Sequence, residues 1–255
     1  MDCTLSYFSS SLIVSTIVMI GIYFVPKESE AKRFDLAWAL GLIGITLFTF
    51  IYNGNFMAKQ ILLTTLTLIS SLRLGLFLYF RPDDKDDKRY ATLKKKLGGN
   101  GLVLFLLQSV IVWLIAFPQI YVNSDVDGTI GIISIIGTFL WLIGFCFESF
   151  ADYQLKMFLN NPANKGKVLD TGLWKYSRHP NYFGQLLISW GLWFFASLHF
   201  KALISPVITY LLIKKFSGIP VVEKKMLTTV PGYADYVKKT NMLVPWFSDD
   251  YWDDK

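Results

Sequence analysis

The 255-residue chain is 53% hydrophobic and 16% aromatic, and only 17% of its residues are charged. This composition excludes an ordinary soluble domain and indicates a protein with the bilayer as its solvent. The formal net charge of +6 would suit a nucleic-acid partner, but the basic residues fall between long apolar runs, which argues against a nucleic-acid-binding stripe. Cys3 and Cys146 are too few for a disulfide framework, and neither has a neighbouring His or Cys that would suggest a metal site.

Seven apolar stretches approach the roughly 20 residues that a membrane-spanning helix needs. In chain order they are 5–25, 34–52, 61–80, 101–121, 129–150, 183–198 and 202–216. The sequence therefore predicts an all-α integral membrane bundle of about seven transmembrane helices that forms a single domain over residues 1–255. Within it, residues 1–100 hold the N-terminal spans and the first large loop, and residues 101–255 the C-terminal region. Because the last two stretches are short, one long bent or re-entrant segment is an alternative.

The distribution of Lys and Arg predicts the topology. Loops on one side of the membrane carry 22 of them and loops on the other side 2, when Lys214 and Lys215 are counted with the C-terminal segment. By the positive-inside rule the N-terminus is then outside and the C-terminus cytoplasmic, which requires an odd number of spans. The long polar segments 81–100, 151–182 and 217–255 all fall on the cytoplasmic side. The expected location is the endoplasmic reticulum membrane for a eukaryotic source and the inner membrane for a bacterial one.

Glu148 and Asp152 stand four residues apart at the end of the fifth stretch. On a helix this spacing places both carboxylates on one face, where like charges repel. If the helix end is simply exposed to solvent, Glu148 and Asp152 need no functional role. Acids at membrane depth are costly unless paired, so the alternative is that they accept hydrogen bonds from a ligand or hold basic residues downstream.

Segment 171–185, with the sequence TGLWKYSRHPNYFGQ, leads into the sixth stretch. It gathers polar side chains around a proline turn: Arg178, His179, Asn181, Tyr182 and Gln185. Arginine presents a fork of donors for phosphate or carboxylate, while His and Asn can donate to a carboxamide or a ring nitrogen. Anchoring at the membrane interface explains Trp174, Lys175 and Tyr176 but explains the His-Pro-Asn run poorly. The segment therefore indicates a binding site.

Arg73 stands in the middle of the third stretch. A buried arginine must pair or line a wet cavity, unless it snorkels to the cytoplasmic end about two turns away. Asp35, at the start of the second stretch, is its most attractive partner by side of the membrane.

The chain resembles the steroid 5α-reductase C-terminal-like family of the 3-oxo-5-alpha-steroid 4-dehydrogenase-like superfamily over most of its length. The segments that carry the resemblance are 172–184 with Glu148 and Asp152, 217–220 with Glu223, and further pieces at 34–38, 73–75 and 87–90. The Arg-His-Pro-Asn-Tyr core is also similar to the sterol C14-reductases and the isoprenylcysteine methyltransferases. The resemblance implies a seven-helix bundle that binds NADPH from the cytoplasmic side and transfers hydride to the β-carbon of a conjugated enone.

The resemblance also implies roles for individual residues. Those expected at the cofactor are Glu148, Asp152, Arg178, His179, Asn181, Tyr182, Gln185, Lys215 and Glu223. Gln185 stands where the reductases usually have Glu, so it keeps hydrogen-bonding capacity and loses the charge. The steroid enzymes polarise the substrate carbonyl with a Glu and a Tyr from the second and third spans. No matching Tyr stands near Ser70, and the candidate catalytic residues here are Asp35, Arg73 and Tyr79, with Tyr52 as another possible donor.

The leading hypothesis is thus an NADPH-dependent membrane reductase of a conjugated double bond in a steroid- or lipid-like substrate that enters from the bilayer. Hydride addition to an enone builds negative charge on its oxygen, so a positioned Tyr, protonated Asp or Arg would stabilise the enolate. A methyltransferase of the isoprenylcysteine type, using S-adenosylmethionine, is the enzymatic alternative. A non-catalytic lipid- or sterol-binding protein of the same fold is the third. The expected partners are the substrate and membrane lipids, with no nucleic acid and no metal.

Overall fold

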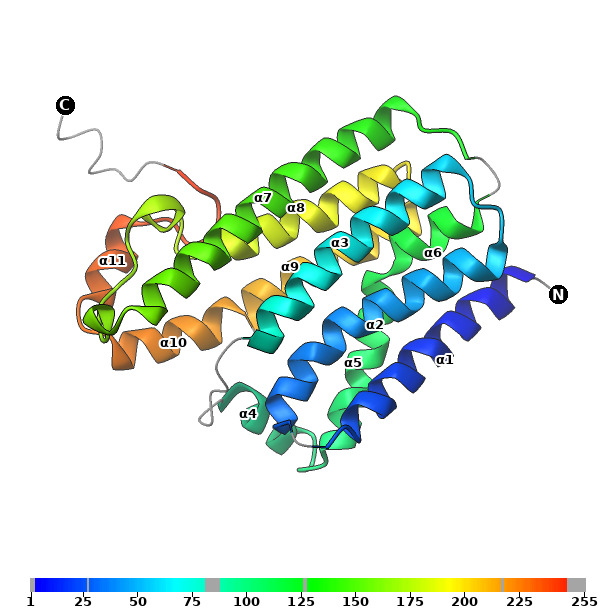
Figure 1. Cartoon of the computed structure of the whole chain (residues 1–255). Helices are drawn as coiled ribbons and strands as arrows, with labels where there is room; N and C mark the ends of the chain where they lie inside the picture. The colour runs from blue at the N-terminus through cyan, green and yellow to red at the C-terminus, as the bar shows by residue number, and fades with distance from the viewer. Residues whose placement is uncertain (1–2, 27, 81–87, 126–127, 217, 247–255) are drawn as a thin grey trace. The chain divides into compact units, whose positions relative to one another are not determined.

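The computed structural model describes residues 3–26, 28–80, 88–125, 128–216 and 218–246. These residues form helices and, over the described ranges, no strand, so the predicted all-α class is confirmed (Figure 1). Five helical segments are long and apolar enough to cross a membrane, and a bent pair of helices makes a sixth. The chain is therefore a multi-pass membrane protein. Part of the predicted loop 81–100, residues 81–87, lies outside the described residues, as do 247–255.

The chain groups into two compact units. Unit 1 comprises Met1–Gly137 and Leu192–Ile208, and unit 2 comprises Thr138–Gly191 and Thr209–Lys255. The division falls inside helices, whereas the sequence predicted one domain with its two regions meeting near residue 100.

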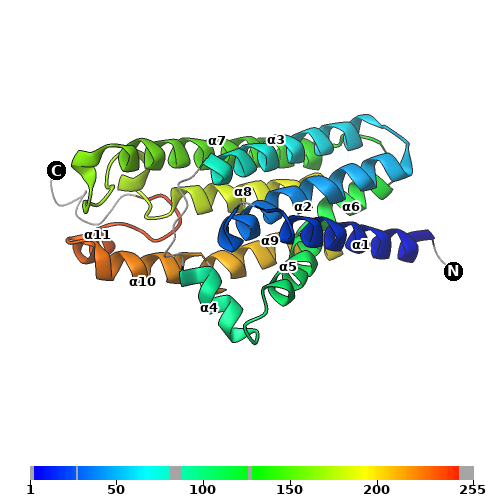
Figure 2. The same cartoon turned by 60° about the horizontal axis from the view of Figure 1, so that its bottom comes forward.

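Unit 1 holds the first six helices. They are α1 (Cys3–Tyr23), α2 (Glu30–Asn53), α3 (Ala58–Phe80), α4 (Lys88–Lys96), α5 (Gly101–Ile115) and α6 (Phe117–Ser124). Helices α1, α2 and α3 lie side by side in both views, and α2 also contacts α5 and α6 (Figures 1 and 2). Side-chain oxygens of Ser29 and Asn100 cap α2 and α5, and Gly54 ends α2 in the left-handed conformation. Pro118 near the start of α6 accompanies a bend of 51° between α5 and α6.

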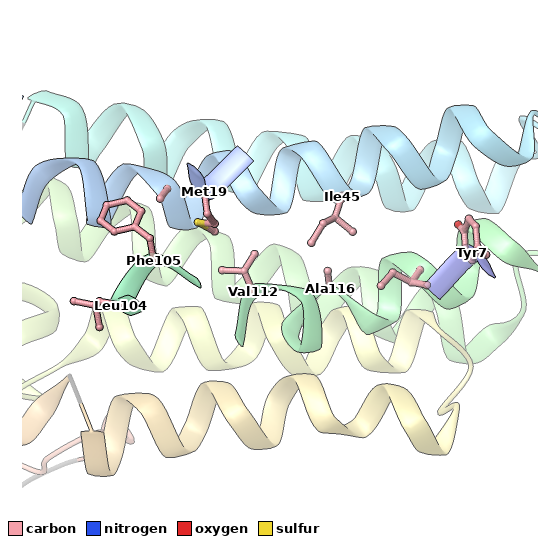
Figure 3. Packing of buried hydrophobic residues seen from close by; sticks show 9 residues of the cluster. Tyr7, Met19, Ile45, Leu104, Phe105, Val112 and Ala116 are labelled. Atoms are coloured by element: carbon pink, nitrogen blue, oxygen red, sulfur yellow. The ribbon is translucent and has the colours of Figure 1, made fainter. Parts of the chain in front are cut away.

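The core of unit 1 packs around one glycine of α2. Lipid is as apolar as the helices, so close packing of small residues contributes more to association in a membrane than burial of apolar area does. A Cβ on Gly41 would lie 2.7 Å from Met19 of α1 and 3.0 Å from Val112 of α5. Met19 and Val112 are fully buried, together with Ile45 and Phe105 (Figure 3). Glycine at position 41 therefore permits α1, α2 and α5 to meet.

Unit 2 holds most of the later helices. These are α7 (Ile132–Asn160), the 3-10 turns η1 (Pro162–Asn164) and η2 (Gly172–Lys175), α8 (Pro180–Phe195), α9 (Ile204–Leu211), the π-helical turn η4 (Leu212–Phe216), α10 (Ile219–Thr229) and α11 (Tyr233–Lys239). Helices α7, α8 and α9 also extend into unit 1, which includes the turn η3 (Phe200–Leu203). In unit 2 a small apolar cluster of Leu186, Ile213 and Ile219 brings α8, η4 and α10 together.

The end of α7 differs from the predicted one. Helix α7 continues ten residues beyond Phe150, and it includes Asp152 on the same helix as Glu148, as the spacing of the two acids predicted. Helices α8 and α9 are separate, as the two predicted stretches were, because Ser197 and Leu198, which follow the end of α8, adopt left-handed backbone angles that interrupt the helix. Helix α8 has only 16 residues, about 24 Å, which is shorter than the roughly 30 Å hydrocarbon layer. By length alone the described chain has five or six spans, and the seventh depends on α8.

Candidate functional site

The site begins where α7 and α8 cross in unit 2. A Cβ on Gly144 would lie 2.6 Å from the carbonyl oxygen of Gly184, and a Cβ on Gly184 would lie 2.6 Å from the carbonyl oxygen of Gly144. The two helices therefore touch backbone to backbone, which only glycine permits at both positions. Glu148 follows Gly144 by one turn, and Asn181 precedes Gly184 by almost one turn. The crossing thus places the first acidic residue of α7 beside the first turn of α8.

Asp152 and Asn181 meet at this end of the two helices. The Asn181 side-chain amide donates to Asp152 Oδ1 over 3.1 Å, and the Asn181 Oδ1 atom accepts from the backbone of Tyr182 at 3.0 Å. Asp152 is 4% exposed and Glu148, one turn earlier on α7, is 5% exposed. Two carboxylates one turn apart and both buried are unusual, because each loses hydration and the other repels it. The expectation of a plain solvated helix end is therefore wrong.

Arg178 is buried and its donors bind protein groups. Its Nε atom lies 2.7 Å from Glu223 Oε1, and its Nη1 atom donates to the carbonyl oxygens of Val237 at 2.9 Å and Thr240 at 2.6 Å. These two carbonyls belong to the last turn of α11, where unpaired carbonyls favour a cation. Arg178 therefore links α10 and α11 to the loop before α8. Its Nε and Nη1 donors bind these protein groups and not the ligand phosphate or carboxylate for which the sequence suggested them.

His179 shares the same carboxylate. Its Nε2 atom lies 3.1 Å from Glu223 Oε1, and its ring stacks on Tyr182 with centroids 5.5 Å apart. Burial lowers the pKa of His179 below its usual value, although the hydrogen bond to Glu223 opposes the shift. The lowered pKa favours the neutral ring of His179, so Glu223 balances mainly the charge of Arg178.

Residues 236–246 make hydrogen bonds to the loop that carries Arg178 and His179. The backbone N–H of Arg178 donates to Asn241 at 2.8 Å, and the backbone N–H of Trp246 donates to Tyr176 at 3.1 Å. The Ser177 hydroxyl donates to the carbonyl of Leu243, and the Tyr236 hydroxyl to that of Trp174. These contacts join residues more than 60 positions apart. Sequence reasoning missed this segment, although Tyr233 and Tyr236, three residues apart on α11, gave a weak sign of a buried aromatic face.

The two remaining cofactor candidates, Gln185 and Lys215, differ in their exposure. Gln185 is half-buried on α8, one turn after Asn181, so it faces the same side of the helix as the Asp152 contact. Lys215 is exposed in η4, and none of the contacts described above involves it. All nine cofactor candidates belong to unit 2, and the contacts described above link six of them: Asp152, Arg178, His179, Asn181, Tyr182 and Glu223.

The candidate catalytic residues belong to unit 1. Asp35 and Arg73 are half-buried on α2 and α3. Tyr79 is 47% exposed, and the Lys32 ammonium lies 4.7 Å from its ring centroid. Since Lys32 precedes Asp35 by one turn of α2, Tyr79 and Asp35 lie at the same end of unit 1. The pairing of Asp35 with Arg73 stays a prediction.

The buried group of unit 2 can accept and donate hydrogen bonds. Glu148 and Asp152 supply carboxylate oxygens, and Asn181 and Gln185 supply amides, which suits a ligand with hydroxyl and carboxamide groups. Over the described residues no three His, Cys, Asp or Glu side chains gather in a way that would hold a metal ion.

The chain was compared with known proteins. No curated protein and no solved structure matches it. A family model described as "Protein of unknown function (DUF1295)" matches residues 23–240, which include α2 to α11 and every candidate residue named above. The chain therefore belongs to the DUF1295 protein family.

Proposed function

We propose that this protein is a membrane-embedded, NADPH-dependent reductase of a conjugated double bond in a steroid- or lipid-like substrate. The observation that carries the proposal is the contact of the buried Asp152 with the half-buried Asn181, with the buried Glu148 one turn away on α7. The resemblance to the steroid 5α-reductase C-terminal-like family at these positions is its second support. The proposed location is the endoplasmic reticulum membrane in a eukaryote or the inner membrane in a bacterium.

The chemistry of these side chains fits a dinucleotide. A buried carboxylate binds a ribose hydroxyl or a carboxamide N–H through a charge-assisted hydrogen bond, which is stronger than a neutral one. Asn181 donates to Asp152 and so holds the carboxylate in one orientation. The orientation matters because a binding site gains affinity when its groups are ordered before the ligand arrives.

Arg178 has a different role in this proposal from the one the resemblance implied. Because Nε and Nη1 bind Glu223 and the end of α11, Arg178 positions the loop that presents Asn181 and Tyr182. Lys215, exposed in η4, is the proposed partner of the cofactor phosphates.

Bound NADPH would supply the hydride for the β-carbon of the enone. The protein's contribution is to stabilise the enolate oxygen and to provide a proton for the α-carbon. Asp35 in its protonated form, Tyr79 and Arg73 are the proposed donors in unit 1.

Nucleotide binding tests the proposal directly. Detergent-purified protein should bind NADPH with a dissociation constant in the micromolar range. Asp152→Asn and Asn181→Ala should each weaken binding about ten- to a hundredfold, because a hydrogen bond to a charged group contributes roughly 1.5 to 3 kcal/mol. The matched controls Asp170→Asn and Asn160→Ala change exposed residues of unit 2 and should leave binding unchanged.

The methyltransferase alternative rests on the Arg-His-Pro-Asn-Tyr core, which the isoprenylcysteine enzymes also carry. Titration with S-adenosylmethionine distinguishes the two. Tight binding of that cofactor without measurable NADPH binding would overturn the reductase proposal. NADPH binding without oxidation by a panel of enone lipids would favour the non-catalytic alternative, and Gln185→Glu then tests whether the missing charge is the reason.

A further inference from the structure

A seam of buried polar side chains runs through unit 1 where α2, α3 and α6 meet. It consists of Thr46, Thr49, Thr64, Thr67, Gln119 and Asn123. Each of the six is 5% exposed or less. Membrane helices bury polar side chains at a cost unless these find partners, and the proposed reductase chemistry uses none of the six. The seam therefore needs a separate explanation.

Some of the polar groups in the seam bind one another. The Asn123 side-chain amide donates to the Thr49 hydroxyl at 2.9 Å and to the carbonyl of Thr46 at 3.3 Å. The Gln119 side-chain amide lies 3.2 Å from the Thr67 hydroxyl. These contacts join α6 to α2 on one side and to α3 on the other.

Four side-chain oxygens of the seam have no hydrogen-bond partner among the described residues. They are Oγ1 of Thr46, Oγ1 of Thr64, Oε1 of Gln119 and Oδ1 of Asn123, each fully buried. Gln119 and Asn123 are one turn apart on α6, and Thr64 lies one turn before Thr67, the partner of Gln119. The four unpaired oxygens thus belong to three helices that contact one another. Because native proteins rarely bury unpaired polar atoms, their grouping points to a ligand.

The chemistry of the oxygens restricts that ligand. The carbonyl of Thr46 can only accept, so the amide orientation of Asn123 is defined and its Oδ1 atom faces the ligand as an acceptor. An anion would be repelled by such acceptors. No carboxylate belongs to the seam, and Asp125, two residues after Asn123, lies 3.7 Å from the buried ammonium of Lys59, which disfavours a cation. A neutral donor fits best.

We propose that the seam binds ordered water. Water donates to the amide oxygens and both donates to and accepts from the threonine hydroxyls, and buried water commonly makes about three hydrogen bonds to such groups. Thr67 lies nine residues into α3, about 14 Å from its start, which is near the middle of a roughly 30 Å hydrocarbon layer. The proposed water lies beside the unpaired oxygens of Thr46, Thr64, Gln119 and Asn123, in the half of the layer that begins at the start of α3.

Removal of single hydroxyls tests the proposal by the sign of a stability change. Thr46→Val and Thr64→Val each replace a hydroxyl that has no hydrogen-bond partner among the described residues with a methyl group of similar size. If water binds there, each should lower the melting temperature of the detergent-purified protein, by about 2–4 °C per hydrogen bond of ordinary strength. Thr65→Val is the control, because Thr65 is exposed and its hydroxyl bonds to the carbonyl of Ile61 within its own helix. A rise, or no change, in both seam variants would mean a dry seam and would overturn the proposal.

Water-edited solid-state NMR of threonine-labelled protein in lipid bilayers gives an independent measurement that needs no variant. Thr46 and Thr64 should receive magnetisation from water early, as the exposed Thr228 of α10 does, and clearly before Thr65. Transfer to Thr46 and Thr64 as slow as that to Thr65 would contradict bound water. Neither experiment depends on nucleotide binding, so failure here leaves the reductase proposal untouched.

Discussion

Arg178 and Glu223, 45 residues apart in the sequence, form a partly buried ion pair in which Nε lies 2.7 Å from Oε1. The pair joins the loop before α8 to the middle of α10, and the carbonyls of Val237 and Thr240 bind the remaining side of the guanidinium. This arrangement makes Arg178 a positioning residue of the candidate site.

Arg178→Ala should therefore reduce stability as well as nucleotide binding. Removal of one partner leaves the other charge buried, which typically costs about 3–5 kcal/mol. Thermal or denaturant unfolding of the purified protein in detergent measures the loss. Lys224→Ala, an exposed neighbour of Glu223 on α10, is the matched control and should change stability by less than about 0.5 kcal/mol.

The double variant Arg178→Ala, Glu223→Ala tests whether the two side chains stabilise the protein as a pair. If the two side chains act as a pair, the double variant should lose clearly less stability than the sum of the two single variants. Strict additivity would mean that each side chain acts alone, contrary to the 2.7 Å contact.

Gly184→Ala should disrupt the crossing of α7 and α8. An added methyl group would meet the backbone of α7, which cannot move aside as a flexible side chain can. Overpacking of this kind typically costs about 1–3 kcal/mol, and the shift of Asn181 relative to Asp152 should weaken NADPH binding as well. Gly21→Ala on α1 is the control, because nothing lies within 4 Å of a Cβ there. In that helix alanine should be neutral or stabilising by up to about 1 kcal/mol.

Acidification should destabilise the protein through His179. Its pKa is lower in the folded protein than in the unfolded chain, because burial disfavours the charged ring. As the pH falls through about 6.5, the unfolded chain takes up this proton first, so the free energy of unfolding decreases. The contribution is fully present above that pH. His179→Gln should remove this part of the pH dependence of the melting temperature, and His199→Gln, which changes the other, exposed histidine, should leave it in place. An unchanged profile in His179→Gln would show that His179 does not titrate with folding.

Membrane topology tests the number of spans. With seven spans, a tag after Lys255 is protease-accessible from the cytoplasmic side and a tag before Leu5 is not. If α8 does not cross the membrane, helix length gives six spans, and both tags would then lie on one side. A third tag in the η3 turn near Lys201 decides whether α8 crosses the membrane, because a crossing places Lys201 opposite the loop before α8.

The sequence by itself determined the fold class, the positions of the helices and the location of the polar motif around residues 171–185. These features are local: a run of about 20 apolar residues must hydrogen-bond its own backbone in lipid, so it becomes a helix wherever it stands. Helix ends were less accurate, as the extension of α7 past Phe150 illustrates, because a helix that continues out of the apolar layer into a partly exposed segment does not look apolar in sequence.

Only the tertiary structure decided what the motif residues contact. The sequence indicated that Arg178 has the right donors for a phosphate, but the same donors suit the carboxylate of Glu223 and the last carbonyls of α11 equally well. Which partner an arginine binds depends on which distant segments pack against it, and here α10 and α11 occupy that place. The backbone contact of Gly144 with Gly184 and the polar seam of unit 1 also depend on which helices pack together. Each exists only where separate helices meet, and spacing within one helix does not reveal its partner.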